Sequence, residues 1–384
     1  MKILYLIDTR LNDGGAPISS HILAKEMAKN GEEVFIIMPC CNDKNLEDNL
    51  ICYRHIKKFW NSFPFEFFHP IQFIKLIFKI EREIKDISPD IIHAEMPRVG
   101  RVISILNKLN KLESKTKLVF TDREYVVDLK KIYKFLYKQT IAKEFDMIIN
   151  LSNSATIFWK NALKHGKYVT IPNPGGNLFD TYSEEEYEKA FKIFPEIPLN
   201  RINIIFVGRM TWEKRWDLAK KVIFKLNEKL KNKINIIIVL AYTTQEQEKE
   251  VKNYILDLIK EKNIYIYQNL GQKELSFLYY LSDIHCITSS RESFGRTAIE
   301  AMSRKTIVIS TDGGAIKETI GRKEFIINDE PNSIVACLEK YILDKKLLEN
   351  EKEIFYKYYQ NKYTVKFNYK SHKQIYEKLL ENKN

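Results

Sequence analysis

Short apolar runs alternate with amphipathic segments along most of the chain. Residues 2–7 form an apolar run, residues 19–30 repeat apolar side chains at helical spacing, and residues 33–38 are apolar again. Gly31 marks the end of the intervening helix. A strand, a helix and a second strand in this order predict a βαβ unit, which builds a parallel sheet.

The same alternation continues through the chain in two series. The first series adds helices near 70–85 and 100–112 and strands at 91–94, 117–121 and 147–151. The second series predicts a helix at 216–231 and strands at 202–207, 234–240, 264–267, 284–287 and 307–310. The fold class is therefore α/β: two Rossmann-like, doubly wound parallel-sheet domains that face a central cleft, where ligands bind at the carboxyl ends of the strands.

A region rich in Pro and Gly, residues 171–198, separates the two series and is interpreted as a linker. At 384 residues the chain suits two domains better than one. We expect an N-terminal Rossmann-like domain at 1–175 and a C-terminal Rossmann-like domain at 176–355. Residues 356–384 are expected to form a C-terminal helix that packs back toward the N-terminal domain.

The net charge is positive, because 62 Lys and Arg residues outnumber 50 acidic residues. This excess suits phosphorylated ligands or an anionic membrane surface, and equally a generic Lys-rich surface. The five cysteines have no metal-ligand spacing, and no apolar run approaches the roughly 18 residues of a membrane span. We therefore expect a cytoplasmic protein with reduced thiols, placed on the inner face of a membrane if it binds one.

The most informative segment runs from 289 to 300, where Glu292 and Glu300 bracket Phe294 and Gly295. An apolar strand precedes the segment and a helix start follows it. Backbone N–H groups at such a turn bind an anion, while the two carboxylates bind hydroxyls nearby. A phosphate that carries sugars matches this arrangement.

A second chemical segment follows the predicted strand at 202–207. It places Arg209 and Lys214 in one loop beside the expected cleft. Arg binds phosphate through two parallel hydrogen bonds and Lys binds it as a point charge. Such a loop alone is most often only solvated surface, but its place in the same half as the 289–300 segment favours a shared anion site.

Taken together, these segments resemble the retaining nucleotide-sugar glycosyltransferases of family 4, which have the GT-B architecture. The resemblance covers nearly the whole chain, and its motifs in the C-terminal half are the more specific ones. It rests on Gly14-Gly15, Ile171-Pro-Asn173, the stretch from Val207 to Lys214, the Glu-x7-Glu segment Glu292 to Glu300 with Ala301-Met302, and the stretch from Ser310 to Glu318.

The resemblance implies that the domain at 1–175 lies on the acceptor side and that the domain at 176–355 binds the nucleotide sugar. It also implies a catalytic set of Arg209, Lys214 and Glu292. The two cations would hold the donor diphosphate and stabilise the charge of the leaving group, and Glu292 would contact the sugar hydroxyls. It also implies a donor-binding set, in which Glu300 binds the ribose and the others surround the phosphates and sugar: Gly15, Phe294, Gly295, Arg296, Thr297 and Glu300. We expect no metal and no cofactor, since the chain has no Asp-x-Asp motif.

The chain departs from the family at the end of the predicted strand 117–121. Many members carry a His there that positions the donor sugar, whereas this chain has Arg123 and Glu124. An Arg at this position suits an acidic sugar, an acceptor phosphate or the donor phosphate. His93 ends a neighbouring strand and is interpreted either as a packed residue or as part of the acceptor and sugar side.

Bases and aromatic side chains interleave densely over residues 53–85. This region is either an interfacial patch that docks on anionic lipid and receives a lipid-linked acceptor, or a core-packing helix with a solvated basic face. The two interpretations are held equal.

The sequence therefore predicts a metal-independent, retaining hexosyltransferase that moves a sugar from a nucleotide-diphosphate donor to a glycan or lipid-linked saccharide in cell-surface polysaccharide or glycolipid synthesis. A sugar-nucleotide epimerase or a phosphorylase on the same scaffold is the alternative within enzymes. A basic nucleic-acid-binding protein is the alternative of a different class. We expect no nucleic-acid partner, because the bases are spread along the chain without a recognition motif.

Overall fold

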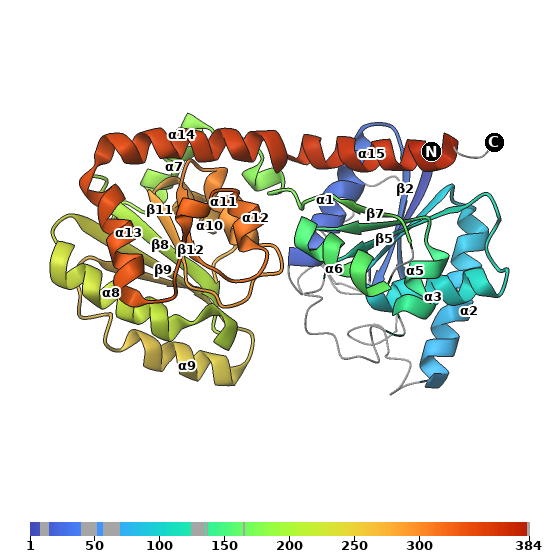
Figure 1. Ribbon diagram of the computed structural model, residues 1–384, viewed down its shortest axis with the longest axis horizontal. Helices are drawn as coiled ribbons and strands as arrows, with labels where there is room; N and C mark the ends of the chain where they lie inside the picture. Colours follow the sequence, from blue (N-terminus) through green and yellow to red (C-terminus); the bar gives the residue numbers. More distant parts are fainter. Residues whose placement is uncertain are drawn as a thin grey trace. The chain divides into compact units, whose positions relative to one another are not determined.

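The computed structural model describes residues 1–7, 15–39, 52–56, 70–123, 135, 137–163 and 166–381 (Figure 1). The chain divides into two compact units, of which the first holds Met1–Asn173 with Val365–Asn384 and the second holds Pro174–Thr364. Each unit is built on its own parallel sheet with helices around it. The predicted α/β fold class is confirmed.

The sheet of the first unit has the strand order β3-β2-β1-β4-β5-β6-β7, and every neighbouring pair is parallel. The strand order reverses between β1 and β4, as in doubly wound sheets. The strands are β1 (Lys2–Ile7), β2 (Glu33–Pro39), β3 (Cys52–Ile56), β4 (Ile91–Glu95), β5 (Lys117–Asp122), β6 (Met147–Asn150) and β7 (Tyr168–Thr170).

Helices cover both faces of this sheet, because successive strand residues point to opposite sides. Leu4 and Leu6 of β1 pack in one core with side chains of α2, α3, α5 and α6, whereas Ile3 and Ile7 pack in the other core with α1 and α15. The helices are α1 (Gly15–Lys29), α2 (Pro70–Ile87), α3 (Pro97–Lys108), α5 (Ile141–Glu144), α6 (Asn153–Leu163) and α15 (Val365–Glu381).

The sheet of the second unit has the order β10-β9-β8-β11-β12-β13, again with parallel pairs. Its central strands are covered on both faces, which explains why β9 reads as one continuous apolar run. The strands are β8 (Ile202–Arg209), β9 (Ile234–Ala241), β10 (Ile264–Gln268), β11 (Ile284–Ile287), β12 (Ile307–Thr311) and β13 (Ile326–Ile327).

Helices and short 3-10 turns connect these strands (Figure 1). The α-helices are α7 (Glu184–Ile193), α8 (Trp216–Leu230), α9 (Gln245–Ile255), α10 (Gln272–Tyr280), α11 (Arg296–Met302), α12 (Ile316–Ile320), α13 (Pro331–Leu343) and α14 (Lys345–Lys362). The 3-10 turns are η4 (Asn177–Phe179), η5 (Trp212–Lys214) and η6 (Lys323–Phe325).

Two features differ from the expectation. The supposed linker contains α7, which begins where the Ser183 side chain accepts a hydrogen bond from the Glu186 backbone N–H. Three acidic residues in the first turn stabilise that helix end. The C-terminal segment is not one helix but two, since α14 ends at Lys362 and α15 begins at Val365.

A buried hydrogen-bond network joins α15 to the centre of the first sheet. The His93 ring lies between two hydroxyls, with Nδ1 at 2.6 Å from Tyr376 Oη and Nε2 at 2.6 Å from Thr121 Oγ1. The Tyr376 hydroxyl also lies 3.1 Å from that of Tyr5. Burial, reinforced by Arg123, holds the pKa of His93 well below its ordinary value, so the neutral ring matches one donor and one acceptor.

We predict that Tyr376→Phe lowers the free energy of unfolding by about 1–3 kcal/mol, because it leaves buried partners of the hydroxyl unsatisfied. Urea titration followed by circular dichroism measures the change.

Tyr168→Phe is the matched control. Its buried hydroxyl has no hydrogen-bond partner within the described part of the chain, so its removal is expected to change stability little. Equal losses in the two variants would contradict the role assigned to the network.

Candidate active site

An ion pair between Lys214 and Glu292 lies at the carboxyl-end side of the second sheet. Lys214 Nζ is 2.5 Å from Glu292 Oε1, and the two side chains are 19% and 11% exposed. The Ser289 hydroxyl donates to the same oxygen at 2.9 Å. Among the described residues, the second carboxylate oxygen of Glu292 has no hydrogen-bond partner, which leaves it available to a ligand.

The loop after β8 holds Lys214 in place. Its backbone carbonyl accepts a hydrogen bond from Thr288 Oγ1 at 2.9 Å, and the Ser290 N–H donates to the Glu213 carbonyl at 2.8 Å. The Lys214 stem lies over Gly208, where a Cβ atom would come within 3.3 Å of it. These contacts fix the loop after β8 against the loop after β11.

A short β-bridge holds Glu292 from the other side. The Glu292 N–H donates to the Gly313 carbonyl at 2.8 Å, and the Ala315 N–H donates to the Glu292 carbonyl at 2.9 Å. A Cβ atom on Gly313 would lie 2.4 Å from the Ser289 carbonyl oxygen. The segment 313–315 therefore fixes the backbone of Glu292, while Lys214 and Ser289 hold its carboxylate.

The turn before α11 presents backbone N–H groups. Gly295 has φ +86°, a conformation that favours glycine, and a Cβ atom there would lie 2.4 Å from Ile316 Cδ1. Within the described chain, the N–H groups of Phe294, Gly295 and Thr297 have no hydrogen-bond acceptor. Phe294 itself is buried against the ring of Tyr363, so the turn is anchored while its N–H groups stay unsatisfied.

Glu300 lies in α11 and is almost completely buried. Arg296, one helical turn earlier, donates from Nε to Glu300 Oε1 at 2.8 Å and from its other end to the Gly175 carbonyl at 3.1 Å. Burial raises the pKa of Glu300, although the nearby guanidinium opposes the shift. The Arg296 side chain therefore orients the Glu300 carboxylate.

Arg209 is the last residue of β8, and its side chain is exposed. Its guanidinium makes no hydrogen bond or ion pair with other described residues. The Trp216 indole fixes the backbone here by donating to the Arg209 carbonyl at 2.9 Å. The side chain is thus a free cation on a fixed backbone, in the same unit as Lys214.

The predicted site residues of the first unit have a different character. His93 is fully buried with both ring nitrogens engaged, which supports a packed residue. Arg123 donates to Glu95 through Nε at 2.7 Å and through a second nitrogen at 3.1 Å, and it contacts Asn173. Its charge is therefore balanced by a protein carboxylate, and its expected contact with a ligand anion stays a prediction. Gly15 opens α1, and Glu124 lies outside the described residues.

Sequence reasoning missed three residues of these clusters. Glu95 is a fully buried carboxylate at the end of β4, and only its pairing with Arg123 shows its role. Ser289 binds Glu292 from three residues away, a local spacing that the sequence contains. Trp212 is 68% exposed under the guanidinium of Arg291, which lies 5.3 Å from the ring. A Trp within a basic loop was the sequence signal that could have identified Trp212.

The described residues provide neither a metal site nor a membrane-spanning helix. No group of three or more His, Cys, Asp or Glu side chains among the described residues has the arrangement of a metal site. None of the described helices combines the length and the apolar character that a membrane crossing needs.

Each half of the chain matches a family profile of glycosyltransferases. Residues 187–358 match the family profile "Glycosyl transferases group 1", and residues 13–174 match the profile "Glycosyltransferase Family 4". The chain is 26% identical over 297 residues to a Klebsiella pneumoniae protein described as an uncharacterized 41.2 kDa protein in the cps region, which covers 75% of this chain and 78% of that one.

Solved structures share the fold at low sequence identity. A glycosyltransferase from Rickettsia africae matches with a TM-score of 0.79 at 21% identity and covers 99% of this chain and 98% of its own. Anabaena HepE, crystallised with UDP and glucose, matches with a TM-score of 0.74 at 16% identity, with coverage of 98% and 99%.

Proposed function

The chain belongs to the group 1, family 4-like glycosyltransferases with the GT-B fold, and we propose that it transfers a sugar from a nucleotide-diphosphate donor with retention of configuration. The family match favours transfer over the epimerase, phosphorylase and nucleic-acid-binding alternatives. Retention rests on the resemblance to the family. The observation that carries the donor assignment is the Lys214–Glu292 pair beside the unsatisfied N–H groups of the turn before α11.

Donor binding exchanges the partner of Lys214. In the free protein Glu292 neutralises this ammonium at 2.5 Å. A diphosphate carries more negative charge than one carboxylate, so it replaces Glu292 as the principal partner of Lys214. The released carboxylate, still held by Ser289, then accepts hydrogen bonds from the donor sugar.

The same groups stabilise the leaving diphosphate. Arg209 is an exposed guanidinium at the end of β8, and the N–H groups of Phe294, Gly295 and Thr297 lack acceptors within the described chain. Preorganised cations and N–H groups of this kind supply several kcal/mol of transition-state stabilisation. Glu300, oriented by Arg296, provides the carboxylate for the ribose hydroxyls.

The similar proteins support the donor and the pathway. Anabaena HepE was crystallised with UDP and glucose and with UDP-glucose, and the Klebsiella relative is encoded in the cps region. We infer a nucleotide-sugar donor and a saccharide acceptor in surface polysaccharide or glycolipid synthesis. The first unit is assigned to the acceptor and the second to the donor.

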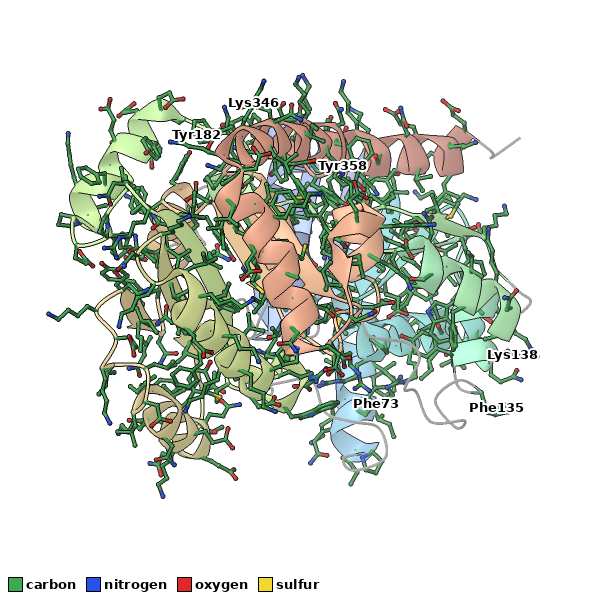
Figure 2. The ribbon with its side chains drawn as sticks, turned by 60° about the vertical axis from the view of Figure 1, so that its left-hand side comes forward. Phe73, Phe135, Lys138, Tyr182, Lys346 and Tyr358 are labelled. Atoms are coloured by element: carbon green, nitrogen blue, oxygen red, sulfur yellow. The ribbon has the colours of Figure 1, made fainter. Side chains whose placement is uncertain are left out.

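The structure of α2 supports an acceptor presented at an anionic membrane surface. Phe73 lies on the face of α2 that packs in the core (Figure 2), whereas Ile71, Ile74 and Phe78 are 67%, 52% and 65% exposed. Their spacing places them along one side of the helix, near Lys75. Apolar and basic side chains on one helix surface suit the lipid interface. Residues 57–69 of the predicted patch lie outside the described residues.

We predict that Lys214→Ala lowers the rate of sugar transfer by about a hundredfold or more, because it removes a cation that stabilises the departing diphosphate. Glu300→Ala is expected to abolish detectable transfer by removing the ribose contact. A thermal-shift panel of nucleotide sugars identifies the donor as the one that stabilises the protein most. Product formation from that donor then measures both effects.

Lys220→Ala is the matched control, since it removes a lysine whose partner Asp257 lies 2.6 Å away on the surface. Its activity should stay near that of the unchanged protein, and all variants should keep the same circular dichroism spectrum. Full activity of Lys214→Ala and Glu300→Ala would contradict the donor assignment.

The membrane proposal predicts that the protein co-sediments with phosphatidylglycerol vesicles at low salt and is released at high salt. The double variant Ile71→Ser/Phe78→Ser should bind the vesicles at least about tenfold more weakly, because it removes apolar area that the interface buries.

Phe191→Ser changes an exposed aromatic residue of α7 and serves as its control. Vesicle binding that is absent, or that all three substitutions leave unchanged, would refute the lipid-surface proposal without touching the donor assignment.

A further inference from the structure

A cavity of about 610 Å³ lies in the second unit at the amino ends of the strands. Asn203 near the start of β8, Lys233 just before β9 and Asp283 just before β11 all line it. Arg209 ends β8, and Glu292 follows the carboxyl end of β11. A strand of the length of β8 spans roughly 23 Å. The cavity is therefore separate from the donor site, and its volume is in the range of small-molecule sites.

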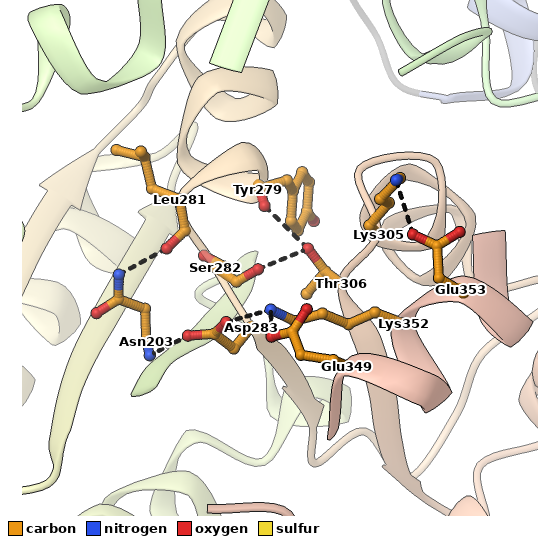
Figure 3. Close-up of polar contacts among 10 residues, drawn as sticks. All are labelled: Asn203, Tyr279, Leu281, Ser282, Asp283, Lys305, Thr306, Glu349, Lys352 and Glu353. Carbon is orange, nitrogen blue, oxygen red and sulfur yellow. Dashed lines mark hydrogen bonds and ion pairs between the residues drawn. The ribbon is translucent and has the colours of Figure 1, made fainter. Parts of the chain in front are cut away.

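Hydrogen bonds and ion pairs connect several polar residues that line the cavity (Figure 3). Asp283 accepts from the Asn203 N–H at 2.7 Å and from Lys352 Nζ at 2.5 Å, and Lys352 also donates to Glu349 at 2.9 Å. Burial alone would lower the pKa of Lys352, but these carboxylates outweigh it and raise that pKa. Lys305 is likewise paired with Glu353 at 2.7 Å.

The remaining cations of the lining are uncompensated. Six of the charged lining residues are cationic and three are anionic. The three carboxylates, Asp283, Glu349 and Glu353, already bind lysines. By contrast, the cationic groups of Arg201, Lys233 and Lys345 have no ion-pair partner among the described residues. The cavity consequently presents a net positive charge to a ligand.

Tyrosine rings form one wall of the cavity. Tyr182 and Tyr280 meet edge to face with their ring centres 5.1 Å apart, and Tyr187 also lines the space. Arg304 lies 4.5 Å from the Tyr280 ring centre and Lys305 Nζ lies 4.7 Å from that of Tyr182. These cations hold the two rings in place. Aromatic rings next to hydrogen-bonding side chains suit the mixed apolar and hydroxyl surface of a sugar ring.

We propose that this cavity is a second binding site, for a sugar that carries a phosphate or a carboxylate. Arg201, Lys233 and Lys345 bind the anionic group, and the tyrosine wall with the exposed Asn232 receives the sugar ring. The proposal depends on neither the donor nor the acceptor assignment, because the cavity lies at the amino ends of the strands and Lys214 lies beyond the carboxyl end of β8.

Isothermal titration calorimetry of the full chain with glucose 6-phosphate, glucuronate, glucose and inorganic phosphate tests the proposal. We expect one or both anionic sugars to bind and to bind more tightly than glucose or inorganic phosphate. The tighter of the two identifies the preferred anion. The double variant Lys233→Glu/Lys345→Glu should weaken that binding by about tenfold or more.

Two controls locate the binding. Lys262→Glu/Lys346→Glu makes the same change in net charge at exposed lysines outside the cavity lining, and Lys214→Ala removes the donor-site cation. Both should bind the anionic sugar as the unchanged protein does. No binding of either anionic sugar, equal binding of inorganic phosphate, or insensitivity to Lys233→Glu/Lys345→Glu would overturn the proposal.

Discussion

The ion pair between Lys214 and Glu292 is the interaction on which the loops at the carboxyl ends of the second sheet depend. It joins the loop after β8 to the loop after β11, and the β-bridge from Glu292 adds the segment around Gly313. Burying a charge costs free energy unless the charge is paired, so each partner offsets the desolvation cost of the other. The pair therefore holds these loops together and, under the proposed function, supplies both a cation and a carboxylate to the donor.

Much of this arrangement could be predicted from the sequence, because parallel sheets produce continuous apolar strands and because strand ends place their loops together. The residues Arg209, Lys214, Glu292 and Glu300 were expected in one half of the chain, and the structure places them in one unit. The pairing of Lys214 with Glu292 was not predictable, since the two are 78 residues apart and only the fold brings them together.

The first unit shows where pattern reasoning reaches its limit. Arg123 was expected to face a ligand anion, and the pattern did not show that Glu95, the last residue of β4, pairs with it. The helix α7 was hidden in a region that Pro and Gly made resemble a linker, although Ser183 followed by three acids is a helix start. Propensity alone also did not show that the C-terminal helix breaks after Lys362, where the chain passes from the second unit to the first.

The central claim is that the donor diphosphate takes Lys214 from Glu292. Titration of the nucleoside diphosphate that the protein binds best, without its sugar, into the unchanged protein and into Glu292→Gln tests this claim most directly. Because Glu292→Gln frees the ammonium from its carboxylate, the account predicts tighter diphosphate binding by that variant together with loss of sugar transfer. Diphosphate binding that is weaker in Glu292→Gln than in the unchanged protein would contradict the account.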